Sequence, residues 1–216
     1  MNKLTWFLCL AFMVFSSACF AVDAEVRVNP YYIVPGDDDS WDNAFGVEAQ
    51  FIKWVNPNVG VAFAAGIGTW EANDEIISWY DPYDGLGYAV GADGSATTVP
   101  IGGSVIIKPL TGGPAELTLE GGLRYVIVSS DVDLIGAASD GFDSIVVEDE
   151  VDIDNGVVGL FGADISFPLS PQAKIGFGAG YQFDIEKGDV TWLGEEIGDN
   201  EMKGFFLRVG ISIDLK

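Results

Sequence analysis

Residues 172–186 alternate between large apolar side chains and side chains that are very small or charged. A period of two indicates a β-strand whose two faces meet different surroundings. One face carries Ala173, Ile175, Phe177, Ala179, Tyr181 and Phe183, and the other carries Lys174, Gly176, Gly178, Gly180, Gln182 and Asp184. The glycines do not fit an ordinary wet sheet face, which would carry Lys, Thr and Glu. The pattern predicts a narrow transmembrane barrel, with lipid outside and a cramped polar lumen inside.

Eight strands of this kind are expected, joined by connections of two alternating kinds. The strands are predicted at 25–34, 42–54, 59–70, 97–108, 115–128, 151–167, 172–186 and 203–215. Tight turns near Pro57, Gly113 and Pro171 alternate with longer, mostly acidic stretches at 35–41, 71–96, 129–150 and 187–202. This asymmetry is typical of an outer-membrane barrel with both termini in the periplasm. A soluble lipocalin-like barrel, with its apolar face turned inward, fits neither the asymmetry nor the glycine-lined face.

The fold class predicted for residues 22–216 is therefore all-β, an eight-stranded antiparallel up-and-down transmembrane β-barrel. Residues 1–21 are expected to be a secretory signal peptide, because Lys3 precedes an apolar run at 4–15 that is too short to span a membrane. Cleavage is expected after Ala21. Cleavage after Ala24 is a second choice, and lipidation of Cys19 is a third interpretation.

Alternation along the predicted strands points a set of charged side chains into the lumen. These are Glu48, Lys108, Glu116, Glu120, Arg124, Asp164, Lys174, Asp184, Arg208 and Asp214. They would either line an ion pathway or pair with one another as a plug. The interior of an eight-stranded barrel is only just wide enough for side chains, and an unpaired buried charge is costly. We therefore favour the plug, with pairs such as Glu120 and Arg208, and keep the pathway as the alternative.

The acidic stretches are the second candidate for chemistry. Taken as 35–44, 71–96, 129–150 and 187–202, they hold 22 of the 33 carboxylates and one base, Lys187. Solvation of the loops is the simplest explanation. The alternative is weak binding of a divalent cation such as Ca²⁺, since hard cations prefer carboxylate oxygens. The ligands would then be Asp149, Glu150, Asp152 and Asp154. No other cofactor is expected, and the net charge of −23 excludes a nucleic-acid binder, which needs a basic face.

Aromatic residues near strand ends and in loops are expected to form the girdles at the two membrane interfaces. They are Trp54, Trp70, Tyr125, Phe167 and Trp192. Trp79, Tyr80, Tyr83 and Tyr88 lie in mid-loop, beyond a girdle, where we expect them to pack within the loop, with a contact surface for a partner or a glycan as the alternative.

The C-terminal residues 208–215 follow a polar-x-Gly-x-x-apolar-x-apolar pattern, with Gly210, Ile213 and Leu215 at its defining positions. This resembles the signal that the barrel-assembly machinery recognises. The architecture of the whole chain is similar to the small eight-stranded outer-membrane barrels of the OmpA, OmpX and OmpW kinds. The resemblance implies a bacterial outer-membrane location, with outer-membrane lipid and the assembly machinery as partners. One departure is the end of the chain, because such barrels usually end on an aromatic residue and this one ends Leu215-Lys216.

The chain contains no histidine. Histidine is the commonest general base near neutral pH, and a Ser-His-Asp triad requires it. The enzymes known among outer-membrane barrels rely on a catalytic histidine, so no catalytic residue is assigned. We expect a non-enzymatic barrel with a structural or surface-interaction role through its acidic extracellular loops, although no motif specifies the surface or envelope ligand. The alternative function is a small porin-like channel for ions or small solutes.

Overall fold

A computed structural model describes residues 23–36, 41–73, 76–81, 83, 86–110, 113–139 and 143–215. The predicted signal peptide, its cleavage after Ala21 and the lipidation of Cys19 lie outside these residues. In the part of the chain that is described, no helix is long and apolar enough to cross a membrane.

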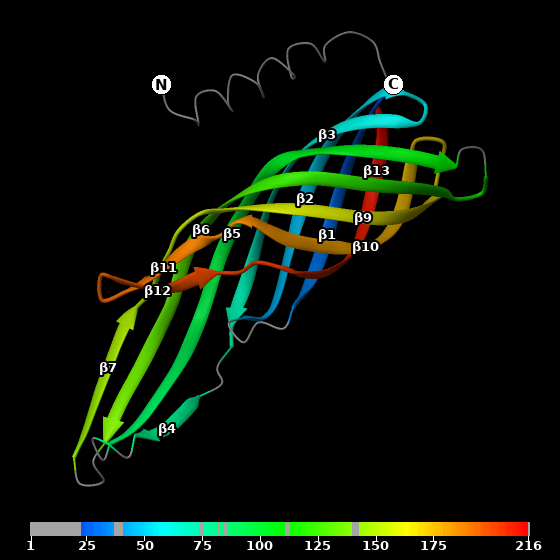
Figure 1. Cartoon of the computed structure of the whole chain (residues 1–216). Helices are drawn as coiled ribbons and strands as arrows, with labels where there is room; N and C mark the ends of the chain where they lie inside the picture. The colour runs from blue at the N-terminus through cyan, green and yellow to red at the C-terminus, as the bar shows by residue number, and fades with distance from the viewer. Residues whose placement is uncertain are drawn as a thin grey trace, which may run out of the picture.

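Eight strands of the described chain close into one antiparallel ring (Figure 1). They are β1 (Ala24–Pro35), β2 (Trp41–Asn56), β3 (Val59–Ala72), β5 (Leu86–Leu110), β6 (Glu116–Ser139), β9 (Gly156–Pro168), β10 (Ala173–Glu186) and β13 (Gly204–Leu215). The ring runs in chain order, and pairing of β1 with β13 closes it. The predicted eight-stranded up-and-down barrel is confirmed.

The side chains that face outward from the barrel are apolar. On β13, Phe205, Leu207, Val209, Ile211, Ile213 and Leu215 are 44–65% exposed. Their neighbours Phe206, Arg208 and Ser212 are buried inside. Leu119, Leu123, Tyr125 and Ile127 give β6 the same exposed apolar face. An apolar surface around a closed ring of strands is what a bilayer requires, because closure satisfies every backbone group in lipid.

The two ends of the barrel differ in their connections. The first and last described strands meet at one end, where Ala24 pairs with Leu215, and the tight turns after β2, β5 and β9 lie at this same end. The long connections lie at the opposite end. In an outer-membrane barrel these are the periplasmic and extracellular ends, respectively.

Much of what the sequence predicted as extracellular loop is strand. β5 has 25 residues and β6 has 24, twice the 12 residues of β13, so the predicted loops at 71–96 and 129–150 were wrong over most of their length. The short strands β4 (Ile77–Asp81) and β7 (Ser144–Glu150) pair with the outer parts of β5 and β6. We call β4, residues 86–94, residues 131–139 and β7 the protruding sheet, which leaves the barrel toward the lower left in Figure 1.

A second, smaller sheet lies at the extracellular end. It consists of β8 (Asp152–Ile153), β11 (Gly188–Trp192) and β12 (Glu195–Asn200) in the order β12-β11-β8. It comes from the connections that follow β6 and β10, and it covers part of the barrel mouth.

Gly94 marks the point where β5 leaves the barrel and enters the protruding sheet. Its φ is +123°, a value that L side chains rarely adopt, and it pairs with Val132 of β6. A Cβ at this position would lie 2.1 Å from the carbonyl oxygen of Asp131. The backbone geometry here therefore requires glycine.

Candidate functional site

A network of buried charges crosses the middle of the lumen, with Glu120 of β6 at its centre. Arg124 donates through Nε to Glu48 at 2.6 Å and through Nη2 to Glu120 at 3.3 Å. From the opposite wall, Arg208 donates through Nη2 to Glu120 at 2.7 Å. Gln50 adds hydrogen bonds of 2.8 Å to Glu48 and 3.0 Å to Glu120. Glu120 thus connects two arginines that come from different strands, and the predicted Glu120–Arg208 pair is present.

Asp164 of β9 extends the network to β1. Arg208 forms a two-pronged contact with it, Nε to Oδ1 at 2.7 Å and Nη2 to Oδ2 at 2.6 Å. Arg27 reaches Asp164 at 3.5 Å and Glu25 at 3.1 Å. Paired planar contacts of this kind are the strong form of an Arg–carboxylate bond. We call these residues the lumen network: Glu25, Arg27, Glu48, Gln50, Glu120, Arg124, Asp164 and Arg208.

The glycines of β10 make room for this network. A Cβ on Gly178 would lie 1.9 Å from Oδ1 of Asp164 and 3.1 Å from Cγ of Arg208. The same addition on Gly176 would meet nothing closer than 3.6 Å. The small side chains therefore allow the charged groups of the facing strands to meet, at Gly178 above all.

A second charged layer lies nearer the periplasmic end. Glu116 accepts from Lys108 at 3.1 Å and from Lys174 at 3.2 Å, and Lys174 also reaches Asp214 at 3.3 Å. The ammonium of Lys108 sits 3.8 Å above the ring of Trp54, in cation–π range. Both layers join opposite charges across the lumen, which is the arrangement that a plug requires.

The structure brings together nearly all the charges assigned to the lumen. Asp184 is the exception, because it lies toward the extracellular end of β10 and accepts from the backbone N–H of Met202 instead. Glu25 and Arg27 were not among the predicted lumen charges, although they alternate with the outward-facing Val26 and Val28. That signal was present in the pattern but was obscured by Pro30 in the same strand.

The extracellular half of the lumen is filled with apolar side chains rather than charges. The buried set includes Ile33, Trp41, Ala44, Trp70, Val126, Val158, Leu160 and Phe206. Trp70 is 2% exposed and Trp54 is 7% exposed, so both point inward and their assignment to the girdles was wrong. A cavity of about 50 Å³ remains between Tyr31, Phe206 and the lumen network, with room for only one or two water molecules.

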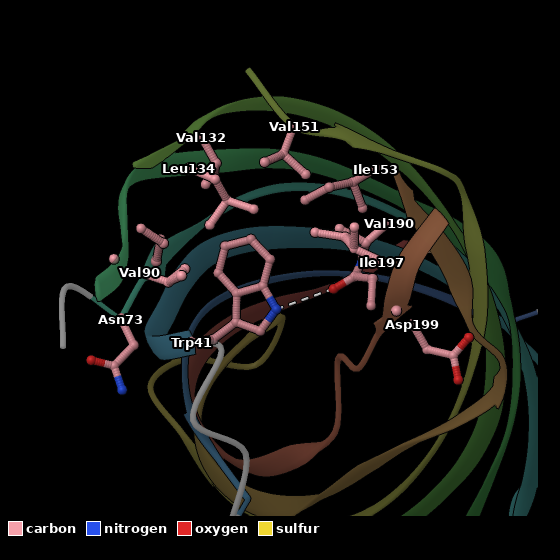
Figure 2. Close-up of a pocket in the computed structure, with 15 residues that line it drawn as sticks. Trp41, Asn73, Val90, Val132, Leu134, Val151, Ile153, Val190, Ile197 and Asp199 are labelled. Carbon is pink, nitrogen blue, oxygen red and sulfur yellow. Dashed lines mark hydrogen bonds between the residues drawn. The ribbon is translucent and has the colours of Figure 1, made fainter. Parts of the chain in front are cut away.

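A larger cavity of about 300 Å³ opens above this apolar core, at the extracellular mouth. Its apolar lining comes from Trp41, Val90, Val132, Leu134, Val151, Ile153, Val190 and Ile197, with Asn73, Asp199 and Asn200 as polar members. The indole N–H of Trp41 donates to Oδ1 of Asn200 at 3.1 Å. Figure 2 shows Trp41 between the side chains from the β5–β6 wall and those from the small sheet. The lining is apolar with few polar groups, as in small-molecule sites, and its volume is near the lower limit for such sites.

The four carboxylates assigned to a cation site are all exposed, and the structure does not gather them. In the described ranges, the group of three carboxylates that comes within 4.8 Å is instead Asp189, Glu196 and Asp199. Lys187 lies beside this group and forms ion pairs with Asp199 and Glu201. The hydrogen bond to Glu201, aided by the nearby negative charges, raises the pKa of Lys187. Calcium binding at Asp149, Glu150, Asp152 and Asp154 stays a prediction.

The C-terminal pattern has a structural role that its sequence did not reveal. Gly210 faces the lumen at the seam between β13 and β1, where a Cβ would lie 2.0 Å from Oδ1 of Asn29. Ile213 and Leu215 face outward and are about half exposed. Packing at the seam is therefore a sufficient reason for glycine at 210, while recognition by the assembly machinery stays a prediction.

Comparison with solved structures gives the same fold. The chain is similar to the outer membrane protein OprG from Pseudomonas aeruginosa, with a TM-score of 0.58 and 11% identity, over 90% of this chain and 96% of that one. It is also similar to a major outer membrane protein from Thermus thermophilus, with a TM-score of 0.51 and 16% identity, over 91% and 100% of the two chains. No family model and no curated protein matches the sequence. The chain thus has the fold of a small bacterial outer-membrane barrel.

Proposed function

We propose that this outer-membrane barrel is closed to ions, has no enzymatic activity, and acts at the cell surface through its acidic protruding sheet. The observation that carries the proposal is the lumen network, in which three arginines and four carboxylates join β1, β2, β6, β9 and β13 across the interior. Buried charges held by partners on facing walls occupy the lumen at this level, which favours a closed interior. The part of the molecule left to act is then the extracellular end, where most of the carboxylates lie.

Single-channel conductance in a planar bilayer tests the closed lumen. The refolded barrel is expected to stay closed. A variant combining Glu120→Ala with Arg208→Ala is expected to conduct, because it removes the centre of the network. Lys187→Ala, an exposed change at the extracellular end, is the control and should stay closed. Steady conductance of the unaltered barrel, at the level of the double variant, would favour the porin-like channel instead.

The mouth cavity favours a second function, the binding of a small apolar molecule at the extracellular end. Its volume suits a molecule of one or two rings, and its lining offers mostly hydrocarbon. Saturation-transfer NMR with toluene is the test. Transfer is expected for the unaltered barrel and should be lost in Val132→Trp, which fills the cavity. Equal saturation transfer to toluene in the two proteins would mean that toluene is bound by the detergent that surrounds the barrel and not by the cavity.

Weak condensation of calcium on the acidic surface is a further part of the proposal. The expected affinity is about 10⁻⁴–10⁻³ M, as in extracellular calcium modules. Sodium chloride should weaken it, because exposed charges are screened beyond a Debye length of about 8–10 Å. Calorimetric titration at low and high salt measures this. The absence of heat at low salt would leave the carboxylates as a solvating surface only.

A further inference from the structure

The strand β7 is an open edge of the protruding sheet. It pairs with β6 along one side, from Asp133 with Glu150 to Ser139 with Ser144. Along its other side, no strand of the described chain pairs with it. All seven of its residues are exposed. Apart from the N–H of Glu150, which donates to the side chain of Asp149 at 3.1 Å, a row of backbone N–H and C=O groups is therefore available to another chain.

The apolar side chains of β7 point to both faces of the sheet. Ile145 is 69% exposed, Val146 is 61% exposed and Val147 is 39% exposed. Alternation places Ile145 and Val147 on one face and Val146 on the other. Across the ladder they meet only Ala138, Ala137 and Gly136, which are too small to cover them. A partner that packs on one face of the sheet would leave the apolar side chains of the other face exposed to water. A strand added along the edge can contact the apolar side chains of both faces.

The charge of this edge restricts what can pair with it. Glu148, Asp149 and Glu150 follow the apolar residues directly, and Asp133 lies beside Glu150 in the register. Residues 71–107 and 125–150 contain no Lys or Arg. A second copy would bring its own run of carboxylates and a further net charge of −23 to the same edge. In an antiparallel pair of two copies, Glu148 and Asp149 of each would lie opposite the apolar Val146 and Ile145 of the other. The mismatch and the added negative charge disfavour self-association, and the edge favours a basic partner.

We propose that β7 binds an extended peptide as an added antiparallel strand, and that the peptide carries basic residues followed by β-branched or aromatic ones. In the antiparallel direction, the basic residues lie opposite Glu150 to Glu148 and the apolar residues opposite Val147 to Ile145. Backbone hydrogen bonds then supply affinity and the side chains supply selectivity. This inference rests on the proposed function at the cell surface, and it names the class of partner that the protruding sheet would bind there.

Fluorescence anisotropy of a labelled peptide against the barrel in lipid nanodiscs tests the inference. The peptide contains the run Lys-Arg-Lys-Val-Tyr-Val, and saturable binding is expected. The reversed run, Val-Tyr-Val-Lys-Arg-Lys, has the same composition and should bind at least tenfold more weakly. N-methylation of alternate amides in the first peptide, on the side that faces β7, should abolish binding while its charge is unchanged. Equal binding of the methylated peptide would overturn strand addition.

Two substitutions on the edge and two matched ones elsewhere locate the site. Val146→Lys and Glu148→Lys should each weaken binding at least tenfold. Leu193→Lys and Glu195→Lys place a lysine at an exposed apolar and an exposed acidic position of the β11–β12 hairpin, and they should have no effect. Equal loss in both pairs would mean attraction to general negative charge and would overturn the proposal. Association of the barrel with itself that Val146→Lys abolishes would instead assign the edge to a second copy.

Failure of this inference can be told apart from failure of the proposed function. Conductance of the barrel depends on the lumen network, and β7 contributes nothing to that network. A closed barrel that ignores every peptide would overturn the inference alone.

Discussion

Arg124 and Phe206 are both buried inside the same barrel, but different forces hold them. Arg124 lies in the half where charges are joined across the lumen at defined distances and angles. Phe206 lies in the half nearer the cell exterior, where apolar side chains fill the volume between the walls. Ion pairs in a dry interior depend on every partner being in place, whereas apolar packing responds in a graded way to lost volume. The charged half should therefore tolerate very few changes, and the apolar half should tolerate substitutions that keep its volume.

The largest effect is expected from Arg208→Met. It leaves Glu120 and Asp164 without their shared partner, and loss of one member of a buried pair costs about 3–5 kcal/mol. Equilibrium urea titration in lipid vesicles measures the loss. Adding Asp164→Leu should recover part of the stability, because it removes one of the stranded carboxylates. A loss below about 1 kcal/mol in the single variant would mean that water reaches these groups and that the lumen is not sealed.

Phe206→Ala should come next, with a loss of about 3 kcal/mol from the cavity that it creates in the apolar half. Phe206→Leu keeps most of the volume and should lose only about 1 kcal/mol. The same urea titration separates the two variants. If Leu proved as damaging as Ala, the apolar half would demand a specific shape, and the contrast with the charged half would disappear.

Gly178→Ala should lose about 1–3 kcal/mol, because the added methyl group collides with Asp164 in the lumen network. Gly176→Ala is its matched control on the same strand and face, where ordinary contact distances leave room for a Cβ. Thermal unfolding followed by a heat-modifiability gel would compare them. Equal destabilisation of both variants would mean that β10 needs glycine for its backbone and not for the charges opposite.

Gly210→Ala should reduce the amount of compact barrel slightly, with a cost of about 1 kcal/mol from the collision with Asn29. Adding Asn29→Ala should restore the yield if the cause is packing at the seam. Fractionation of outer membranes gives the yield. A deficit that Asn29→Ala leaves unchanged would identify Gly210 as part of the assembly signal, and Leu215→Asp should then produce a deficit of the same kind.

The barrel strands could be predicted because lipid and lumen impose opposite demands on alternate residues. Trp54 and Trp70 were placed at the interfaces because of their residue type, although alternation with Glu48 and Gly68 already pointed them inward. Register was the better guide, since a strand has no freedom to turn one side chain to the other face. The contacts within the lumen network could not be predicted, because which Arg meets which carboxylate depends on the stagger between distant strands.

The protruding sheet escaped prediction for a different reason. Outside the membrane the outer face of β6 becomes polar, as at Asp131 and Asp133, while its inner face becomes apolar, as at Val132 and Leu134. The alternation that marks the barrel strands, with apolar residues outside, is therefore inverted there. Pairing continues there residue by residue from Gly87 with Ser139 onward. Backbone hydrogen bonds between β5 and β6 hold these strands together, and the amino-acid composition gives little sign of this pairing.

Gly94 lies at the base of this sheet, with a backbone angle that other residues rarely adopt. At about 3.3 Å per residue, the part of β5 beyond it, residues 86–93, spans roughly 26 Å, close to the thickness of the hydrocarbon core of a bilayer. An arm of that length therefore leaves the barrel at a residue whose backbone conformation requires glycine. Replacing this glycine would leave every chemical group at the outer end of the protruding sheet unchanged. It would still alter the height and direction of that end, and so change which neighbouring molecules the sheet can contact.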